Sequence, residues 1–206
     1  MSRKEDKNLK KDRILQTALK LFSRQGFGST TTKEIAAECG VAEGLIFYYF
    51  GDKRKLLLEI VRKFTFLLHV EDSQAQLSHL SLEDALVQYG LKYLTFLKEN
   101  SDYILLIWSP EMFQDEMVSQ EVLQLLQKMG AAGEALLNRG SSEEQAKDTD
   151  TYVIALTTFT SSLLVHYMVT SRFGAQLQTI DDETYVRKLV DLLVNGLTHS
   201  QERRLS

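Results

Sequence analysis

Apolar side chains recur at three- and four-residue intervals along almost the whole chain, the spacing that places them on one face of a helix. In the first such stretch Ile14, Ala18 and Leu21 form the stripe, which predicts a helix over about residues 9–25. Gly26 follows directly and favours a helix end, because glycine adopts the left-handed backbone conformation readily. Long runs of Leu, Ala, Glu, Lys and Gln with a single proline also favour helix. The pattern predicts an all-α protein.

Two short helices separated by a tight turn are predicted next. Thr31 and Glu34 have the spacing of a capping box, in which each side chain accepts a hydrogen bond from the other residue's backbone N–H. The helix that follows should end near Cys39, because Gly40 can supply a left-handed stop, and a third helix is predicted over about residues 43–50. Such a pair fits a helix-turn-helix. Short helix pairs also occur in ordinary bundles, so this spacing alone leaves DNA binding open.

A longer helix is predicted over about residues 53–69, where Leu56, Ile60, Phe64 and Leu67 form the next apolar stripe. This helix would bridge the two halves of the chain. Further helices are predicted over about residues 82–100, 101–108, 110–137, 143 or 150 to 173, and 181–199. Pro110 should interrupt or kink the helical run in which it lies.

Charge is distributed unevenly around a formal net charge of −4. Residues 1–63 hold fourteen Lys and Arg against eight Asp and Glu, a net charge of +6, so residues 64–206 carry −10. A basic N-terminal part joined to an acidic body is typical of a protein that meets phosphates at one end. A solvated charged tail is the alternative.

Composition narrows the class of protein further. At 206 residues and 44% hydrophobic content, the chain can bury a real core. The single cysteine, Cys39, excludes an internal disulfide and a metal site built on a cysteine pair. The N-terminal residues lack the apolar stretch of a signal peptide, and the most apolar segment, residues 152–169, is broken by Thr, Ser and His. We expect a soluble, cytoplasmic protein that needs no cofactor.

One stretch carries a dense motif. Residues 26–57 read GFGSTTTKEIAAECGVAEGLIFYYFGDKRKLL. The motif positions, in order, are Gly26-Phe27, Thr30-Thr31, Ile35-Ala36, Gly40-Val41, Gly44, Phe47-Tyr48-Tyr49-Phe50 and Lys53. In order and spacing this string closely resembles the N-terminal domain of the tetracycline-repressor (TetR) family of bacterial transcription regulators.

The resemblance implies an organisation and a function. It implies a helix-turn-helix DNA-binding domain over residues 1–53, with its motif at about 31–50, and a helical effector-binding and dimerisation bundle over 54–206. It also implies a homodimer, formed through the last two helices, whose two heads match a palindromic operator in double-stranded DNA. Burial of those helices inside a monomer is the alternative. The expected function is a sequence-specific transcriptional repressor that a small lipophilic effector releases from its operator.

Both the resemblance and the helix pattern contribute to the expected DNA contacts. These are Thr31, Thr32, Lys33, Glu43, Gly44, Leu45, Phe47, Tyr48, Tyr49 and Lys53. The resemblance implies that Lys53 and the residues opening the second helix meet phosphates, with Lys53 the foremost, while the exposed side of the third helix enters the major groove. Internal packing should use Ile35, Val41, Ile46 and Phe50. Lys10 and Lys11 either add contacts or belong to a disordered tail.

The predicted third helix departs from the family's usual pattern at four positions. Ala42 stands where a capping hydroxyl is common, Leu45 where a hydroxyl often contacts DNA, and Phe47 where the family usually has tyrosine. Glu43 is repelled by phosphates unless its carboxylate accepts a hydrogen bond from a cytosine amino group. We therefore expect the DNA sequence to be read through apolar contacts with thymine methyl groups and through the two tyrosines that follow Phe47.

An effector pocket is implied among the helices between the bridging helix and the last two. The candidate lining residues are Phe64, Leu68, Tyr89, Tyr93, Tyr103, Trp108, Phe113, Phe159 and His166. Each of them could equally be ordinary core. Mostly apolar walls with a few polar groups would suit a lipophilic molecule such as a drug, a fatty acid or an acyl thioester.

Two other classes of protein are alternatives for an all-α chain, a helical enzyme and an architectural DNA-binding protein. The four histidines, at positions 69, 79, 166 and 199, have no metal-binding spacing, and neither an HExxH nor a GxSxG motif is present. We therefore expect no enzyme and no metal site. An architectural DNA-binding protein without an effector would instead show strong, salt-dependent affinity for any DNA sequence.

Overall fold

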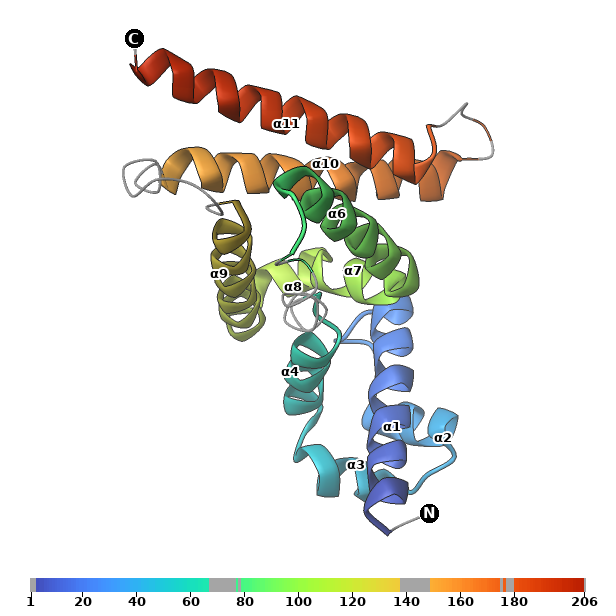
Figure 1. The fold of residues 1–206 in the computed structure, drawn as a ribbon. Coiled ribbons are helices and arrows are strands. Elements are labelled where there is room, and N and C mark those ends of the chain that lie inside the picture. Colours follow the sequence, from blue (N-terminus) through green and yellow to red (C-terminus); the bar gives the residue numbers. More distant parts are fainter. Residues whose placement is uncertain are drawn as a thin grey trace. The chain divides into compact units, whose positions relative to one another are not determined.

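The computed structural model describes residues 3–66, 77, 79–137, 149–174, 176 and 180–205. Every regular element in these residues is a helix, so the predicted all-α class is confirmed (Figure 1). The chain forms two compact units. The first unit comprises residues 1–65 and 100–125, and the second comprises residues 66–99 and 126–206. Packing thus groups the fourth helix and a later segment with the helix-turn-helix, and the expected division of function at residue 53 stays a prediction.

The first unit contains the predicted three-helix head. Its helices are α1 (Arg3–Gln25), α2 (Thr32–Cys39), α3 (Glu43–Phe50), α4 (Lys53–Lys63), α7 (Ser101–Ile107) and α8 (Pro110–Gln114). The core consists of fully buried apolar side chains, among them Ile14, Ala18, Phe22, Ile35, Ile46, Leu56, Leu57 and Ile60. The apolar stripe expected on the first helix is therefore its packing face. Pro110 occupies the first turn of α8 after the N-cap Ser109, which confirms an interruption there.

The fourth helix is shorter than the sequence predicts. It ends at Lys63 rather than near residue 69, and Phe64 takes the C-cap position. Phe66 lies beyond this end, where its buried ring joins an aromatic cluster of the second unit. The helical spacing of Phe64 and Leu67 did not reveal this change of path, because Phe66 packs against residues distant in the sequence. Leu67 lies outside the described residues.

The second unit is built on three long helices and the end of a fourth. These are α6 (Leu82–Glu99), α9 (Glu116–Leu137), α10 (Thr149–Phe173) and α11 (Asp182–Leu205). Helix α6 packs against both α10 and α11 (Figure 1). Gly90 permits this approach: a Cβ atom there would lie 2.8 Å from Val186 Cγ1 and 3.0 Å from Phe159 Cζ. Both distances are shorter than ordinary van der Waals contact, so a side chain at position 90 would force the helices apart.

Helix α10 is more apolar than expected from its Thr, Ser and His residues. Val153–Phe173 has the length and, at a mean hydropathy of 1.5, the composition of a membrane-spanning helix, although soluble proteins also contain such helices. The Thr, Ser and His residues that interrupt residues 152–169 do not bring the helix below this measure. Only 22% of the helix's most apolar window is buried. Much of this apolar surface lacks a partner within the described residues.

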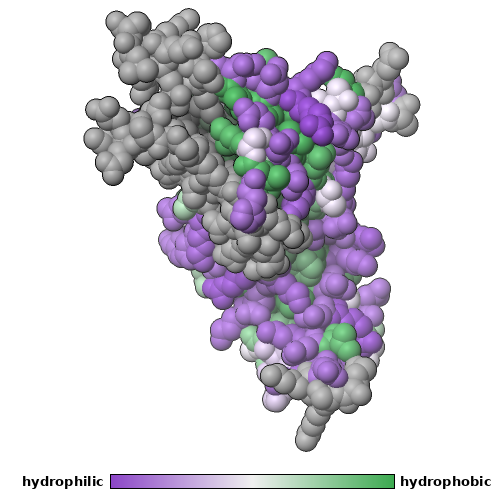
Figure 2. Space-filling view, viewed as in Figure 1, coloured by the Kyte–Doolittle hydropathy of each residue, from purple (hydrophilic) through white to green (hydrophobic). Residues whose placement is uncertain are grey.

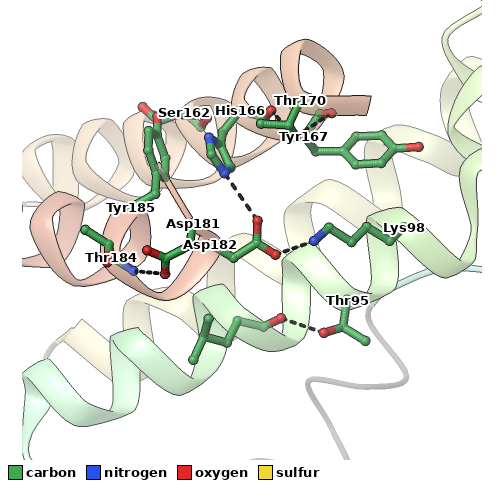
Figure 3. A network of polar contacts seen from close by, with 11 residues as sticks. Thr95, Lys98, Ser162, His166, Tyr167, Thr170, Asp181, Asp182, Thr184 and Tyr185 are labelled. Atoms are coloured by element: carbon green, nitrogen blue, oxygen red, sulfur yellow. Dashed lines mark hydrogen bonds and ion pairs between the residues drawn. The ribbon is translucent and has the colours of Figure 1, made fainter. Parts of the chain in front are cut away.

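A polar network joins α6, α10 and α11 (Figure 3). His166 Nε2 lies 3.3 Å from Asp182 Oδ1, and the other oxygen of that carboxylate accepts a hydrogen bond from the Lys98 ammonium. The His166 ring is buried and stacks on Tyr185 with 3.9 Å between ring centroids. Tyr185 in turn donates to the Ser162 carbonyl at 3.2 Å. Asp182 is the centre of the network, because it receives hydrogen bonds from two helices.

We expect replacing Asp182 with alanine to lower the free energy of unfolding by about 1–3 kcal/mol, because the buried His166 ring loses its acceptor. Arg187→Ala on the same helix is the matched control. It removes an exposed ion pair with Glu183 and should cost about 0.5 kcal/mol or less. Urea denaturation of both variants measures the difference. Equal losses would mean that the Asp182 network adds no more than a surface ion pair.

Candidate nucleic-acid interface

The turn geometry of the helix-turn-helix is set by local hydrogen bonds. The Glu34 N–H donates to Thr31 Oγ1 at 3.1 Å, and the Thr31 N–H donates to the Glu34 carboxylate at 2.7 Å. The predicted capping box is therefore confirmed. The Thr31 hydroxyl also donates to the Glu34 carboxylate, at 2.8 Å. The bond from the Thr31 N–H and then the bond from its hydroxyl lower the pKa of Glu34, because both favour the charged carboxylate. Gly40, with φ of 64°, supplies the predicted left-handed stop and donates its N–H to the last turn of α2.

Helix α3 has a buried face and an exposed aromatic face. Ile46 and Phe50 are buried against the other helices of the head, as predicted. Phe47 and Tyr48 are 47% and 71% exposed. Gly44 lies one turn before them, with open space where a Cβ would stand. The outer face of α3 is therefore exposed, which leaves its side chains accessible for contact with base edges.

Two of the expected DNA contacts are bonded to each other. The Thr32 hydroxyl, at the start of α2, donates to Glu43 Oε1 at the start of α3, with 2.5 Å between the oxygens. While it makes this bond, the hydroxyl cannot also donate to a phosphate. Glu43 thus joins the two helices and still has one carboxylate oxygen left to accept a hydrogen bond.

Lys53 lies against the turn between α1 and α2. Its ammonium donates to the carbonyls of Phe27 and Thr30, each at 2.8 Å, and lies 4.3 Å from the centroid of the Phe27 ring. An ammonium has three N–H donors, so one remains for another acceptor. The structure gives Lys53 the role of closing this turn against the start of α4, and its contact with phosphate stays a prediction.

Two lysines of α1, Lys7 and Lys11, lie over aromatic rings of α3. Lys10 and Lys11 are helical and pair with Asp6 and Glu59, at 2.8 and 2.9 Å. They are therefore not part of a disordered tail. Lys7 was missed by the sequence analysis, and its ammonium lies 5.5 Å from the centroid of the Tyr48 ring. Its position one turn before Lys10 and Lys11 was the signal that could have revealed it. Thr31 and Lys33 are both exposed.

Acidic residues of the segment 100–125 bind earlier residues of the same unit. The Glu111 carboxylate accepts the backbone N–H groups of Phe27 and Gly28, at 2.9 and 2.7 Å. Three further pairs follow the same pattern, namely Ser23 with Asp102, Arg54 with Asp115, and Arg62 with Glu121. The charge pattern of the sequence places these acids in an acidic body distinct from the basic N-terminal part. Nothing in their spacing indicated that they contact residues about 60 to 85 positions earlier.

The candidate effector residues that the structure describes are divided between the two units. Tyr89, Tyr93 and Phe159 lie together in the second unit, with Phe66 and Phe96, which the sequence analysis missed. The others are placed as follows: Tyr103 in the first unit donates to the Val61 carbonyl, Trp108 and Phe113 are exposed, Phe64 caps α4, and His166 belongs to the polar network of the second unit. Leu68 lies outside the described residues. Effector binding by any of them stays a prediction.

Metal binding has no geometric support in the part of the chain that is described. There, no three His, Cys, Asp or Glu side chains are placed to hold an ion together.

Comparisons with known proteins agree with this geometry. Residues 14–60 match the family model described as bacterial regulatory proteins, tetR family. The chain is 26% identical over 198 residues to YerO of Bacillus subtilis, an uncharacterized HTH-type transcriptional regulator, an alignment that spans 94% of this chain and 67% of YerO. It is 27% identical over 113 residues to IcaR of Staphylococcus aureus, a negative transcriptional regulator of a biofilm operon, with 53% of this chain and 60% of IcaR aligned.

A solved structure supports the fold. FadR from Bacillus subtilis, a transcriptional regulator solved in complex with stearoyl-CoA, superimposes with a TM-score of 0.71 at 16% identity, covering 90% of this chain and 98% of that one. At this identity the likeness establishes the fold alone.

We expect replacing Glu111 with alanine to speed hydrogen exchange of the Phe27 and Gly28 amides about fivefold or more, because both lose a charged acceptor. Nuclear magnetic resonance resolves these two amides individually. Glu116→Ala, an exposed acid at the start of α9, is the control and should leave both rates unchanged. If the Glu111 variant also leaves them unchanged, the turn is held by other groups.

Proposed function

Because this chain is a helix-turn-helix regulator of the TetR family, we propose that it represses transcription from a palindromic operator as a homodimer and releases DNA when it binds a lipophilic effector. The exposed outer face of α3 above the buried Ile46 and Phe50 carries the DNA-binding part of the proposal. The similarity to IcaR, a negative regulator, supports repression. The chain would act by binding rather than by catalysis, in the cytoplasm where bacterial DNA lies.

The reading of DNA would combine aromatic and polar groups of one helix. Phe47 and Tyr48 are the most exposed large side chains of α3 and would contact thymine methyl groups in the major groove. Glu43, oriented by Thr32, would accept from a cytosine amino group through its remaining oxygen. Lys33 and the remaining N–H of Lys53 would contact phosphates, positioning the helix without reading sequence. Thr31 would do so only by giving up the hydrogen bond from its hydroxyl to Glu34. Leu45 and Tyr49 are half-buried and would contribute at the edge of this surface.

Dimerisation would cover the apolar surface of α10 and α11. Figure 2 shows apolar side chains gathered over helices of the second unit. The exposed apolar residues here are Val153, Ile154, Val165, Met168, Val169 and Phe173 on α10, Ile180 before α11, and Leu192 on α11. A hollow of about 230 Å³ beside Val165, Val169 and Ile180 could receive a side chain of the partner. Exposed apolar surface of this extent is typical of an interface between subunits.

The effector would bind in the second unit. The aromatic cluster around Tyr89 and Phe159 supports a lipophilic molecule, and the stearoyl-CoA bound by FadR, which has the same fold, gives acyl thioesters as one class to test. The effector must favour the conformation whose two heads are wrongly spaced for the operator, because a ligand with equal affinity for both conformations changes no equilibrium. An architectural protein would lack this response.

Selection of bound duplexes from a random pool tests the proposed DNA binding. We expect the wild type to return an inverted repeat, and Glu43→Gln to change the preference at a G·C position, because an amide both donates and accepts. Glu38→Gln, at an exposed acid of α2 that is not an expected DNA contact, is the control and should keep the motif. The same motif for Glu43→Gln would mean that Glu43 does not read a base. Equal affinity for random and selected duplexes at equal salt would favour the architectural alternative.

A charge on the exposed face of α11 tests the proposed dimer. Leu192 is 71% exposed, so Leu192→Asp should leave the folded monomer intact and raise the dimer dissociation constant at least tenfold, because the interface would bury a carboxylate. Leu105→Asp is the matched control, since Leu105 is 63% exposed on α7. Sedimentation velocity gives the association state of both. A dimeric Leu192→Asp variant with unchanged affinity would place the interface elsewhere.

A further inference from the structure

Three lysines on one face of α1 hold their ammonium groups in different ways. Lys7, Lys10 and Lys11 are spaced three and four residues apart, which places them on the same side of the helix. The Lys10 ammonium donates to the Asp6 carboxylate at 2.8 Å. The Lys11 ammonium donates to the Glu59 carboxylate at 2.9 Å. Within the described part of the chain no carboxylate pairs with Lys7, so its charge is left for other groups.

The Lys7 ammonium lies over two tyrosine rings of α3. It is 5.5 Å from the centroid of the Tyr48 ring and 5.8 Å from that of the Tyr49 ring. The two ring centroids are 5.3 Å apart, and the ring planes are tilted by 57°. A cation within about 6 Å of a ring centroid is attracted by the negative face of the ring. One ammonium therefore attracts two adjacent rings on the helix that is expected to read DNA.

Tyr48 depends on such contacts because its side chain is 71% exposed. An exposed ring can take several rotamers, and fixing it against DNA costs conformational entropy. Contacts that already hold the ring in the free protein reduce this cost on binding. The ring and cation contacts of Tyr48 in the described residues come from Tyr49 and Lys7. Of these two, only Lys7 belongs to another helix, so it links the ring to α1.

We propose that Lys7 is a positioning residue for DNA recognition, whose ammonium holds the Tyr48 and Tyr49 rings in the orientation in which α3 reads base edges. This inference rests on the DNA binding proposed above and assigns Lys7 to discrimination between sequences. A lysine that binds phosphate adds affinity for every sequence and steepens the salt dependence. A lysine that acts through two rings adds affinity only where those rings meet the correct bases.

Nuclear magnetic resonance tests the contact in the free protein. Ring currents shift protons that lie over an aromatic face upfield, so the ε-methylene protons of Lys7 should resonate upfield of those of the exposed Lys33. The double variant Tyr48→Leu, Tyr49→Leu should remove this shift, because both rings are gone. A Lys7 signal at the Lys33 position in the wild type, or a shift that survives in the double variant, would overturn the proposal.

Affinities for the selected duplex and for a random duplex of equal length separate positioning from charge. Lys7→Gln should weaken binding to the selected duplex about threefold more than binding to the random one, because the rings lose their cation. Lys10→Gln is the matched control, since it removes the same charge from the same helix face but frees Asp6 instead of a ring. It should weaken both duplexes equally. Lys7→Arg keeps a cation over the rings and should keep the wild-type ratio of affinities.

A double-mutant cycle shows whether Lys7 acts through the rings. In the Tyr48→Leu, Tyr49→Leu background, Lys7→Gln should change the affinity for the selected duplex by less than about twofold, because the interaction it removes is already absent. An equal loss in both backgrounds, together with a salt dependence lowered by about one phosphate contact, would mean that Lys7 binds DNA directly and would overturn the proposal.

The outcomes for Lys7 and for the proposed function can be told apart. A wild type with equal affinity for selected and random duplexes would overturn the sequence-specific function and the role of Lys7 with it. A wild type that prefers the selected duplex, with Lys7→Gln and Lys10→Gln behaving alike, would leave the proposed function standing and overturn the role of Lys7 alone.

Discussion

The placement of α2, and through it of α3, depends on how the turn between α1 and α2 is held. Gly26 turns the chain with a φ of 86°, and the backbone groups that follow lack helical partners. The Lys53 ammonium binds the carbonyls of Phe27 and Thr30, and the Glu111 carboxylate binds the N–H groups of Phe27 and Gly28. Charged side chains therefore satisfy both kinds of backbone group in one turn, and α2 starts directly after it.

Helices α3 and α10 each have one side buried in the protein and the opposite side exposed. In α3, Ile46 is fully buried while Tyr48 is largely exposed, and in α10 the buried Leu163 is followed by the exposed Val165. The buried sides determine which way each helix is turned. The exposed aromatic surface of α3 suits the major groove, whereas the broad apolar surface of α10 suits a second copy of the chain.

The second unit contains two buried polar side chains with opposite hydrogen-bonding states. His166 has Asp182 as its partner, so its ring ties α10 to α11 and contributes to the fold. Tyr89 has no partner within the described residues, so its buried hydroxyl lowers the stability of the fold. The two side chains therefore affect the stability of the fold in opposite directions.

The sequence by itself determined the helical class, the capping box of Thr31 and Glu34, and the stop at Gly40. It determined these because each depends on residues within about four positions, where spacing and backbone preference decide the hydrogen bonds. Only the tertiary structure decided that Glu111 holds the first turn and that Phe66 leaves the fourth helix for an aromatic cluster. Such contacts join residues distant in the sequence, so the path of the folded chain, and not local spacing, brings them together.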